Sequence, residues 1–394
     1  MKKQPLGILI ASSHRVFDGV GGVEKFTSLL NEELYDRGHK TMLLYRRSFP
    51  NLIGTLIKNS EKLKRSKEKS TNLAVPYWAY LVNMIIFSSV IILISLRLAK
   101  KSHIDIIHAQ DPVFAGAPMS IVSKLTGIPA IIHCHGSIPQ PHRHKNASIS
   151  WGIERLLYLY SIKSKSTFIC TDNVTAEYLI EDGLSKNNCI TLPAFIDSKF
   201  FGRNYEKKKA SKTTLGYIGR LVKIKRVDLL IEALSHLKMW GYNVDVRIIG
   251  DGILKNDLIK LCDSLNVREL VSFEGWISNV EEILSEIDIF VLPSDSEGSP
   301  ISLLEAMAAG KPCIVTNLRS IRNLVGMKCV KYFRRGNSKH LAESIREIID
   351  SSSVQRELES SAREISQNFS IQKGVEKIEQ IYLSRIKKIS NIHE

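Results

Sequence analysis

Short apolar runs alternate along the chain with segments whose apolar residues recur every three or four positions. The runs, bounded by Gly, Pro or polar residues, are typical of strands buried in a parallel sheet, and the spaced segments are typical of amphipathic helices. This alternation predicts an α/β fold. We expect strands at residues 6–12, 40–45, 104–109, 130–136, 168–171, 190–193, 214–221, 244–250, 271–273, 287–294 and 313–316.

A chain of 394 residues is too long for one ordinary hydrophobic core, which favours two domains. Residues 203–212 are polar and without periodicity, so they are the expected linker. The strand and helix order begins afresh after them, which gives predicted domains at 1–205 and 213–370. Helices are expected at residues 23–34, 118–125, 153–161, 174–181, 227–234, 258–265, 280–285, 300–310, 341–349, 354–365 and 371–389, with no strand after the last.

An uncharged segment interrupts this pattern at residues 70–96. Its apolar part, 77–96, is long enough to span a bilayer, with Tyr and Trp at one end and basic residues after the other. A single span would place the strands at 6–12 and 104–109 on opposite sides of a membrane, which conflicts with their membership of one sheet. Three interpretations remain: a buried or partner-facing helix, an interfacial or hairpin membrane anchor, and a true span.

The net charge of +15 adds a second constraint. Residues 1–200 hold 25 Lys and Arg against 15 Asp and Glu, so most of the surplus lies in the first half. Basic proteins bind nucleic acid, anionic membranes or phosphorylated ligands. The basic run at 58–69 has no interleaved aromatic residues, and the chain has no recognisable nucleic-acid-binding motif. We therefore expect residues 58–101 to contact an anionic membrane surface, and we expect no nucleic acid as a partner.

The six cysteines show no CxxC pair, and the first apolar run is too short for a signal peptide. We therefore expect reduced thiols in a cytoplasmic protein. His142 and His144 lie in a Pro-rich loop near His135, but the spacing of these three histidines matches no metal motif. We expect no metal and no other cofactor, and the sequence leaves the oligomeric state open.

Two features of the first half suggest ligand contacts. The first strand leads toward Gly21 and Gly22, where glycine lets the backbone approach a ligand closely. The pattern is not G-x-G-x-x-G, which argues against a dinucleotide site, and a tight turn without a ligand is the alternative. His135 falls at the end of a predicted strand, where parallel sheets bind ligands. His108 and His133 lie inside strands, so we expect hydrogen-bonded core residues there.

A strand, a tight loop and a helix start lie within residues 287–312 of the second half. The exposed N–H groups and the positive dipole end at such a helix start favour an anionic ligand. Glu297 in the loop and Glu305 in the helix are suited to bind hydroxyl groups of one ligand. Arg220 and Lys225 lie in a cation-rich loop before another helix, which suits a polyphosphate, with solvated surface charge as the alternative.

Several spaced motifs together resemble the retaining glycosyltransferases of family 4. The resemblance implies the GT-B architecture, in which two Rossmann-like α/β/α domains with parallel sheets face each other across a cleft. The first domain would bind the acceptor, with the helix at 371–394 packing back on it, and the second would bind the nucleotide sugar. The motifs are Gly219-Arg220-Leu221 with Lys225, Gly250-Asp251-Gly252, Phe273-Glu274-Gly275, Glu297-Gly298, the run 304–312, and, in the first half, 21–24 and 135–136.

The resemblance also implies a role for each matching residue. Arg220 and Lys225 would hold the donor diphosphate, Glu297 would bind a hydroxyl of the donor sugar, and His135 would contact that sugar near the reacting face. These four are the implied catalytic residues, and Glu305 would bind the ribose. The remaining donor-binding positions are Gly21, Gly22, Gly298, Ser299, Pro300, Ile301 and Ser302.

The implied reaction is the metal-independent, retaining transfer of a hexose or N-acetylhexosamine from a nucleotide sugar, most often UDP-linked. The acceptor would be a glycan or lipid-linked glycan in the synthesis of a cell-surface polysaccharide, lipopolysaccharide or glycolipid. Same-face attack, with the leaving phosphate as base, is the usual explanation of retention, and a covalent intermediate on Glu297 is the rival. The basic run and the apolar segment would place the enzyme peripherally on the inner face of the cell membrane.

Two positions depart from the family pattern. Arg226 stands where the family often has glycine, and Ser299 stands where an aromatic residue is common. Both leave the site chemistry intact but put the donor-sugar preference in doubt. The alternatives are a GDP-mannose-dependent mannosyltransferase, a catalytically silent GT-B binding protein, a phosphorylase or epimerase, and an NAD-binding dehydrogenase. The intact carboxylates and cations argue against a silent protein. A phosphorylase or epimerase would need a cofactor lysine site or a different set of acid and base residues, and the sequence contains neither. The absence of G-x-G-x-x-G argues against a dehydrogenase.

Overall fold

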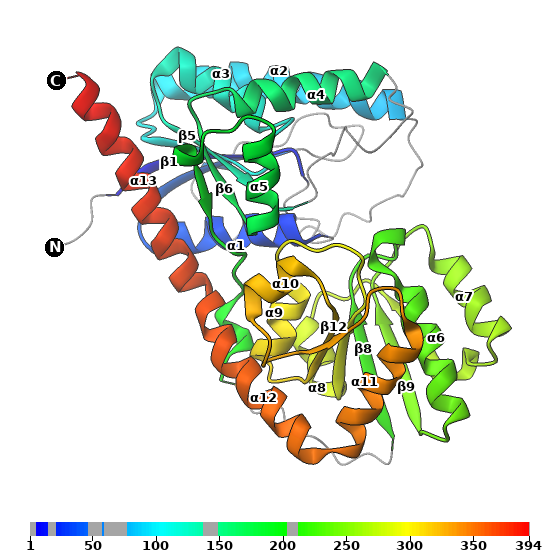
Figure 1. Ribbon diagram of the computed structural model, residues 1–394. Coiled ribbons are helices and arrows are strands. Elements are labelled where there is room, and N and C mark those ends of the chain that lie inside the picture. The colour runs from blue at the N-terminus through cyan, green and yellow to red at the C-terminus, as the bar shows by residue number, and fades with distance from the viewer. Residues whose placement is uncertain are drawn as a thin grey trace. The chain divides into compact units, whose positions relative to one another are not determined.

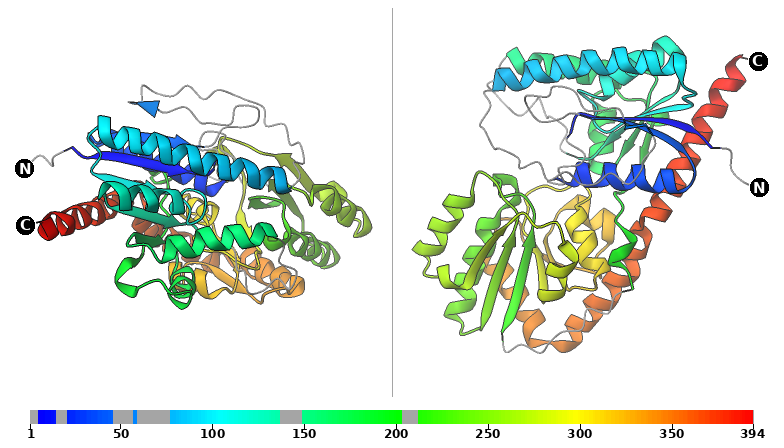
Figure 2. Two further views of the ribbon diagram at one scale, coloured as in Figure 1. Left: turned by 90° about the horizontal axis from the view of Figure 1, so that it is seen from above. Right: turned by 180° about the vertical axis from the view of Figure 1, so that it is seen from behind.

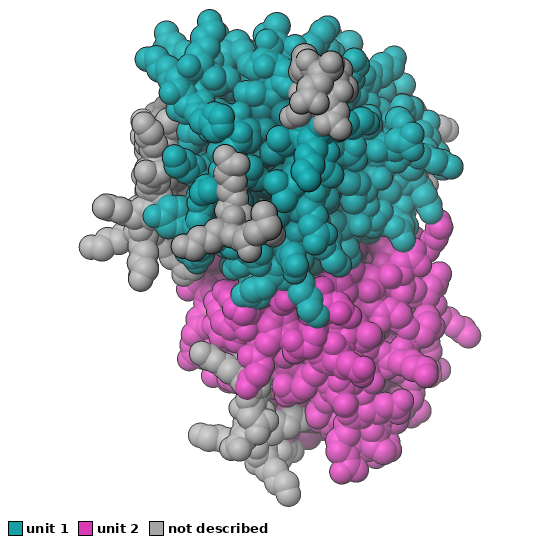
Figure 3. All heavy atoms as spheres, turned by 90° about the vertical axis from the view of Figure 1, so that its left-hand side faces the viewer, with its two compact units in different colours: residues 1–194, 371–394 teal, residues 195–370 magenta. Residues whose placement is uncertain are grey.

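The computed structural model describes residues 5–14, 21–45, 57–58, 77–136, 149–202 and 212–393. The chain divides into two compact units, which Figure 3 colours separately: unit 1 holds residues 1–194 and 371–394, and unit 2 holds residues 195–370. Unit 1 ends before the predicted boundary because Ile196 and Phe200 are buried in the hydrophobic core of unit 2. The predicted linker lies almost entirely outside the described residues.

Unit 1 is built on a seven-stranded sheet with the strand order β3-β2-β1-β4-β5-β6-β7. Neighbouring strands are parallel except β3, which pairs with β2 in the antiparallel direction. Strands β1, β4 and β5 are buried along their whole length, which explains why their sequences are continuous apolar runs. The strands are β1 (Gly7–Ser12), β2 (Lys40–Tyr45), β3 (Ile57–Lys58), β4 (Ile106–Ala109), β5 (Ala130–Cys134), β6 (Thr167–Cys170) and β7 (Cys189–Thr191).

Helices cover both faces of this sheet. Helices α2, α3 and α4 lie on one face, and α1 lies on the other (Figures 1 and 2). Helix α13 packs against α1, and its Glu379 contacts His39 at 3.0 Å and Arg37 at 3.4 Å. The last helix of the chain is therefore part of unit 1. The helices are α1 (Gly22–Asp36), α2 (Tyr77–Lys101), α3 (Gly116–Thr126), α4 (Ile149–Ile162), α5 (Asn173–Glu181) and α13 (Ile371–His393).

Helix α2 contains the apolar part of the uncharged segment, residues 77–96. By length and composition its residues 81–101 are sufficient to cross a membrane, and 33% of the most apolar window is buried inside the protein. Strands β1 and β4, which precede and follow α2 in the chain, pair side by side in one sheet. The helix therefore packs as a folded part of unit 1, with a buried side and an exposed apolar side. The buried side carries Leu81, Met84, Phe87 and Ile91, and the exposed side carries Val82, Ile85, Ile86 and Leu93.

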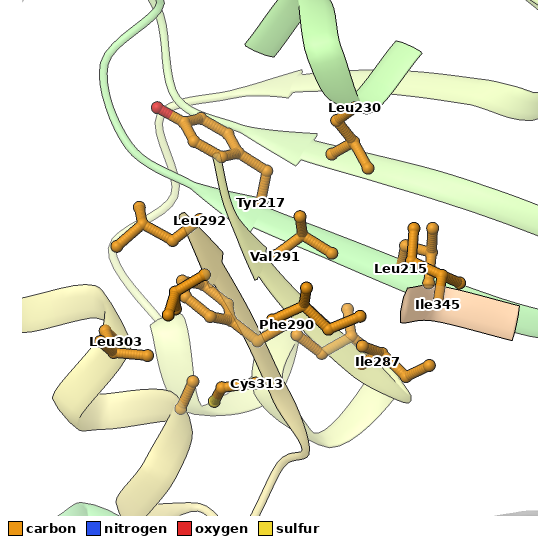
Figure 4. Close-up of a cluster of buried hydrophobic side chains, with 14 of the residues drawn as sticks. Leu215, Tyr217, Leu230, Ile287, Phe290, Val291, Leu292, Leu303, Cys313 and Ile345 are labelled. Atoms are coloured by element: carbon orange, nitrogen blue, oxygen red, sulfur yellow. The ribbon is translucent and has the colours of Figure 1, made fainter. Parts of the chain in front are cut away.

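Unit 2 is built on a six-stranded parallel sheet with the order β10-β9-β8-β11-β12-β13. Figure 4 shows part of its core, where Leu215 and Tyr217 of β8 lie among apolar side chains that include Phe290 and Val291 of β11. Its strands are β8 (Thr213–Ile218), β9 (Val244–Ile249), β10 (Val271–Gly275), β11 (Ile289–Leu292), β12 (Cys313–Thr316) and β13 (Lys331–Phe333). Its α-helices are α6 (Val227–Met239), α7 (Lys255–Ser264), α8 (Val280–Glu286), α9 (Ile301–Ala308), α10 (Arg319–Val325), α11 (Ser338–Asp350) and α12 (Ser352–Ser366).

Each sheet has one point where the strand order reverses. In unit 2, β8 pairs with β9 on one side and with β11 on the other, so the reversal lies between β8 and β11. In unit 1, the corresponding reversal lies between β1 and β4. Open α/β sheets bind ligands in the crevice beyond the carboxyl ends of the strands at such a point. These two positions are therefore where ligand-binding side chains are expected.

Candidate functional site

In unit 2, the loop after β8 carries the predicted cations. The phenol of Tyr217 points away from the core cluster in Figure 4 and donates to the backbone carbonyl of Arg220 at 2.9 Å. Burial raises the pKa of Tyr217, and the charge of Glu297 raises it further, so this phenol stays protonated as a donor. The Arg220 side chain is exposed and has no hydrogen bond or ion pair with another described residue. Its guanidinium is therefore available to an anionic ligand.

The same loop packs closely on its neighbour after β9. Gly250 has a φ of +133°, and a Cβ atom there would lie 1.9 Å from the carbonyl oxygen of Gly219. The N–H of Leu221 donates to the carbonyl of Asp251 at 2.9 Å. The Gly250-Asp251-Gly252 motif thus has a structural explanation, because its first glycine permits the backbone contact that positions Arg220.

Lys225 and Glu297, which are 72 residues apart in the chain, meet at the reversal between β8 and β11. The Lys225 ammonium Nζ donates to Glu297 Oε1 at 2.6 Å, and the hydroxyl of Ser294 donates to the same oxygen at 2.6 Å. The two charged side chains are only 18% and 7% exposed. Glu297 Oε2 receives no hydrogen bond from the described part of the chain, so one carboxylate oxygen is held in place and the other is open to a ligand hydroxyl.

The start of α9 lies directly after Glu297. Gly298 and Ser299 form the turn, and Pro300 at the N-cap has no side chain that can accept a hydrogen bond. The N–H groups of Ile301 and Ser302 begin the helix, where the dipole is positive. Glu305 lies further along α9 and is 2% exposed. The structure thus places Glu297, Gly298 and Ser299 directly before one helix start, and it joins Glu297 to Lys225 of a separate loop.

The predicted residues of the first half lie in unit 1. Gly21 is the N-cap of α1, and its φ of −142° is extended backbone that any residue adopts. A Cβ atom at Gly21 would meet only the flexible end of Glu24. Gly22 is the first residue of α1. The backbone conformation therefore does not require glycine at position 21. The small size of glycine, which lets a ligand approach the backbone closely, is the remaining explanation for glycine there.

His135 follows β5 and belongs to a stack of three histidines. Its ring lies 4.3 Å from that of His133, which in turn lies 5.5 Å from that of His108. Burial lowers the pKa of His108 and of His135 to about 3, and it lowers the pKa of His133 as well. All three rings are therefore neutral near pH 7. His108 Nδ1 bonds the Tyr382 hydroxyl at 2.6 Å, as expected for a core residue. The same expectation is wrong for His133, because its buried ring makes aromatic contacts but neither nitrogen has a hydrogen-bond partner among the described residues.

Gln110 was not predicted, although it follows β4 at the reversal point of unit 1. Its Oε1 lies 2.9 Å from His135 Nε2, so Nε2 carries the ring proton and Nδ1 is left as an acceptor. Ser294, whose hydroxyl donates to Glu297, was not predicted either.

The described residues contain no group of three or more His, Cys, Asp or Glu side chains that could hold a metal ion, and His142 and His144 lie outside them.

The sequence matches the models of two glycosyltransferase families. Residues 20–200 match Glycosyltransferase Family 4, and residues 199–365 match Glycosyl transferases group 1. The UDP-Gal:alpha-D-GlcNAc-diphosphoundecaprenol alpha-1,3-galactosyltransferase of Escherichia coli is 26% identical over 310 residues, which cover 75% of this chain and 79% of that protein. The capsular polysaccharide biosynthesis glycosyltransferase CapM of Staphylococcus aureus is 26% identical over 254 residues, which cover 58% of this chain and 66% of that protein.

A solved structure shows the same fold. Alr3699/HepE from Anabaena, in complex with UDP and glucose, has a TM-score of 0.72 at 16% identity, covering 96% of this chain and 100% of that chain. The two family matches together span residues 20–365, and the named relatives are glycosyltransferases, one of them in capsular polysaccharide biosynthesis. The chain is therefore a glycosyltransferase with the GT-B fold, and it belongs to glycosyltransferase family 4.

Proposed function

We propose that this chain transfers a hexose or N-acetylhexosamine from a UDP-linked sugar to a glycan or lipid-linked glycan in cell-surface polysaccharide or glycolipid biosynthesis. The contact of Lys225 with Glu297 at the reversal between β8 and β11 carries the proposal, because it joins a cation and a hydroxyl-binding carboxylate where such sheets bind nucleotides. The names of the relatives support it: the E. coli relative is named for UDP-Gal and a lipid-linked diphosphate, and the Anabaena structure holds UDP and glucose.

In this proposal, unit 2 binds the donor. The exposed Arg220 guanidinium, the Lys225 ammonium and the N–H groups at the start of α9 hold the diphosphate. Oε2 of Glu297 accepts a hydrogen bond from a sugar hydroxyl, and Glu305 accepts from the ribose. The donor roles of Gly21, Gly22 and His135 in unit 1 stay predictions from the sequence.

We propose a retaining reaction without a metal. Two cations and a helix dipole offset the charge that develops on the leaving diphosphate, which is the task that a metal performs in other transferases. The ammonium and the hydroxyl that both engage Glu297 Oε1 stabilise the carboxylate charge and lower its nucleophilicity. This contact supports same-face attack by the acceptor over a covalent intermediate on Glu297.

The ribose role of Glu305 is tested by nucleotide binding. UDP at a hundred times its dissociation constant stabilises a protein by about 2.7 kcal/mol, so it raises the melting temperature of the parent chain. We expect Glu305→Ala to weaken UDP binding tenfold or more, by about 1.4 kcal/mol, and Glu305→Gln, which preserves the side-chain volume, to weaken it too. Glu347→Ala, at a side chain 50% exposed, is the control. Unchanged UDP affinity in both Glu305 variants refutes this role.

We also propose that unit 1 docks on an anionic membrane from the cytoplasmic side. The exposed apolar side of α2 lies next to basic residues at its end, Lys100 and Lys101, and α4 adds exposed Leu156 and Tyr160. Apolar side chains beside cations suit an interface of anionic lipids. The basic run at 58–69 precedes α2 in the sequence, and most of it lies outside the described residues.

Flotation with vesicles of anionic phospholipid tests the docking surface. We expect the parent chain to float with the vesicles, less so at high salt, because the lipid attracts the cations through a screened interaction. Leu93→Glu, at a position 65% exposed on α2, is expected to reduce flotation. Met327→Glu, at a position 61% exposed in unit 2, should not. A parent chain that remains with the soluble fraction, or equal flotation of both variants, contradicts this proposal.

A further inference from the structure

Arg226 has an uncommon backbone conformation. Its φ of +49° and ψ of 44° are left-handed, and it serves as the N-cap of α6. The described residues contain one other non-glycine residue with positive φ, Asn266, and asparagine tolerates this region far better than arginine does. A strained residue persists where the surrounding structure over-determines it, and such positions concentrate at functional sites.

The Arg226 side chain forms ion pairs with two carboxylates. Its Nε and Nη2 bind the Asp228 carboxylate at 3.0 and 2.9 Å, and its Nη1 binds Asp295 Oδ2 at 3.3 Å. The other oxygen of Asp295 accepts from Arg335 Nε at 3.0 Å. The Arg226 side chain is 26% exposed and the Asp295 side chain 24% exposed, so the contact is partly shielded from water.

These contacts join two loops that have different tasks in the proposed donor site. The loop after β8 carries Arg220 and Lys225, which face the diphosphate, and the loop after β11 carries Asp295 and Glu297. Three contacts connect them: Lys225 with Glu297, Arg226 with Asp295, and the N–H of Asp295 with the carbonyl of Ile224 at 2.8 Å. Glycine at position 226 would relieve the backbone strain but would remove one of the three contacts.

We propose that Arg226 is a positioning residue, whose ion pair with Asp295 holds the sugar-binding carboxylate of Glu297 in register with the diphosphate-binding loop. The inference rests on the proposed function, because it assigns the two loops to the two halves of a nucleotide sugar. Arg226 itself contacts neither half. It sets the distance between the groups that do, so it affects binding of a whole UDP-sugar more than binding of UDP alone.

The test compares Arg226→Gly with Arg226→Ala. Both remove the guanidinium, but only alanine keeps a Cβ atom at positive φ, so Arg226→Gly is expected to melt at the higher temperature. The probes are UDP and whichever of UDP-glucose, UDP-galactose and UDP-N-acetylglucosamine the parent chain binds best. Both variants should bind UDP within about twofold of the parent and the UDP-sugar about tenfold more weakly, a loss of the size expected for a coupled pair.

Asp295→Asn provides the partner variant. It should show the same selective loss. The double variant Arg226→Gly/Asp295→Asn should lose less UDP-sugar affinity than the sum of the two single losses, because each single change already breaks the contact that the two residues share. Each change also affects one further contact, that of Arg226 with Asp228 or that of Asp295 with Arg335. Additive losses, or equal losses for UDP and the UDP-sugar, overturn the positioning role. Amide hydrogen exchange across residues 289–303 gives a readout without ligand and should be faster in both Arg226 variants. Unchanged exchange also overturns the inference, whereas a parent chain that binds no UDP overturns the proposed function.

Discussion

Replacing Glu297 by glutamine is expected to lower kcat/KM by about a hundredfold to a thousandfold, the largest effect on activity that the structure predicts. The change leaves the ammonium of Lys225 beside a neutral amide in a site where the carboxylate is only 7% exposed, and it removes the charge that would bind the sugar hydroxyl. Transfer or hydrolysis of the UDP-sugar, measured with purified protein, gives the result directly.

A matched control separates this effect from general loss of charge. Glu269 accepts from Lys238 at 2.8 Å in an ion pair of the same type, but its side chain is 62% exposed. Exposed pairs contribute little, so Glu269→Gln should keep activity within about twofold of the parent. If Glu297→Gln retained a tenth or more of the parent activity while remaining folded, the role of this carboxylate in the reaction would be wrong.

Gly250→Ala is expected to destabilise unit 2 by about 3 kcal/mol or more, the largest effect on stability predicted here. The substitution combines a φ of +133° with a Cβ placed 1.9 Å from the carbonyl oxygen of Gly219. The backbone of one loop must therefore shift, and that loop positions Arg220. Thermal or urea unfolding measures the loss, and UDP binding should weaken in the fraction that still folds.

Gly241→Ala is the control for this prediction. Gly241 also has positive φ, at +83°, but a Cβ atom there meets nothing within 4 Å. It should cost only the left-handed backbone conformation, about 1 kcal/mol. Equal destabilisation by the two changes would show that the contact between the loops after β8 and β9 contributes nothing to stability.

Much of the fold follows from apolar pattern because the central strands of both sheets are buried on both faces. The runs that predicted β1 and β11 are continuous for this reason, and the alternation with amphipathic helices predicted parallel sheets. Three short elements were missed. β3 has two residues and β13 has three, too few for any periodicity, and α10 is a seven-residue helix with three polar or charged residues in its first four.

In the site, too, local sequence pattern predicted some residues and missed others. Glu297 and Glu305 were singled out from a local pattern, because strand, loop and helix start are adjacent in sequence. The contact of Glu297 with Lys225 depends on the pairing of β8 with β11, which no local pattern contains. Ser294 and Gln110 were missed because a serine or glutamine at a strand end has no distinctive spacing. The left-handed conformation of Arg226 was hidden for another reason, since only the family's glycine at that position hints at it.

The path of the chain through unit 1 has a consequence for its synthesis. Residues 195–370 of unit 2 are synthesised before α13, and α13 supplies Glu379 to His39 and Tyr382 to His108. Until those residues leave the ribosome, the first-made unit lacks the α13 partners of two buried histidines, although His39 keeps its hydrogen bond from the N–H of Leu6. It also lacks the helix that contacts His108 of β4. The half of the enzyme that is translated first is thus completed last, and newly made chains expose part of the sheet of unit 1 throughout the translation of unit 2.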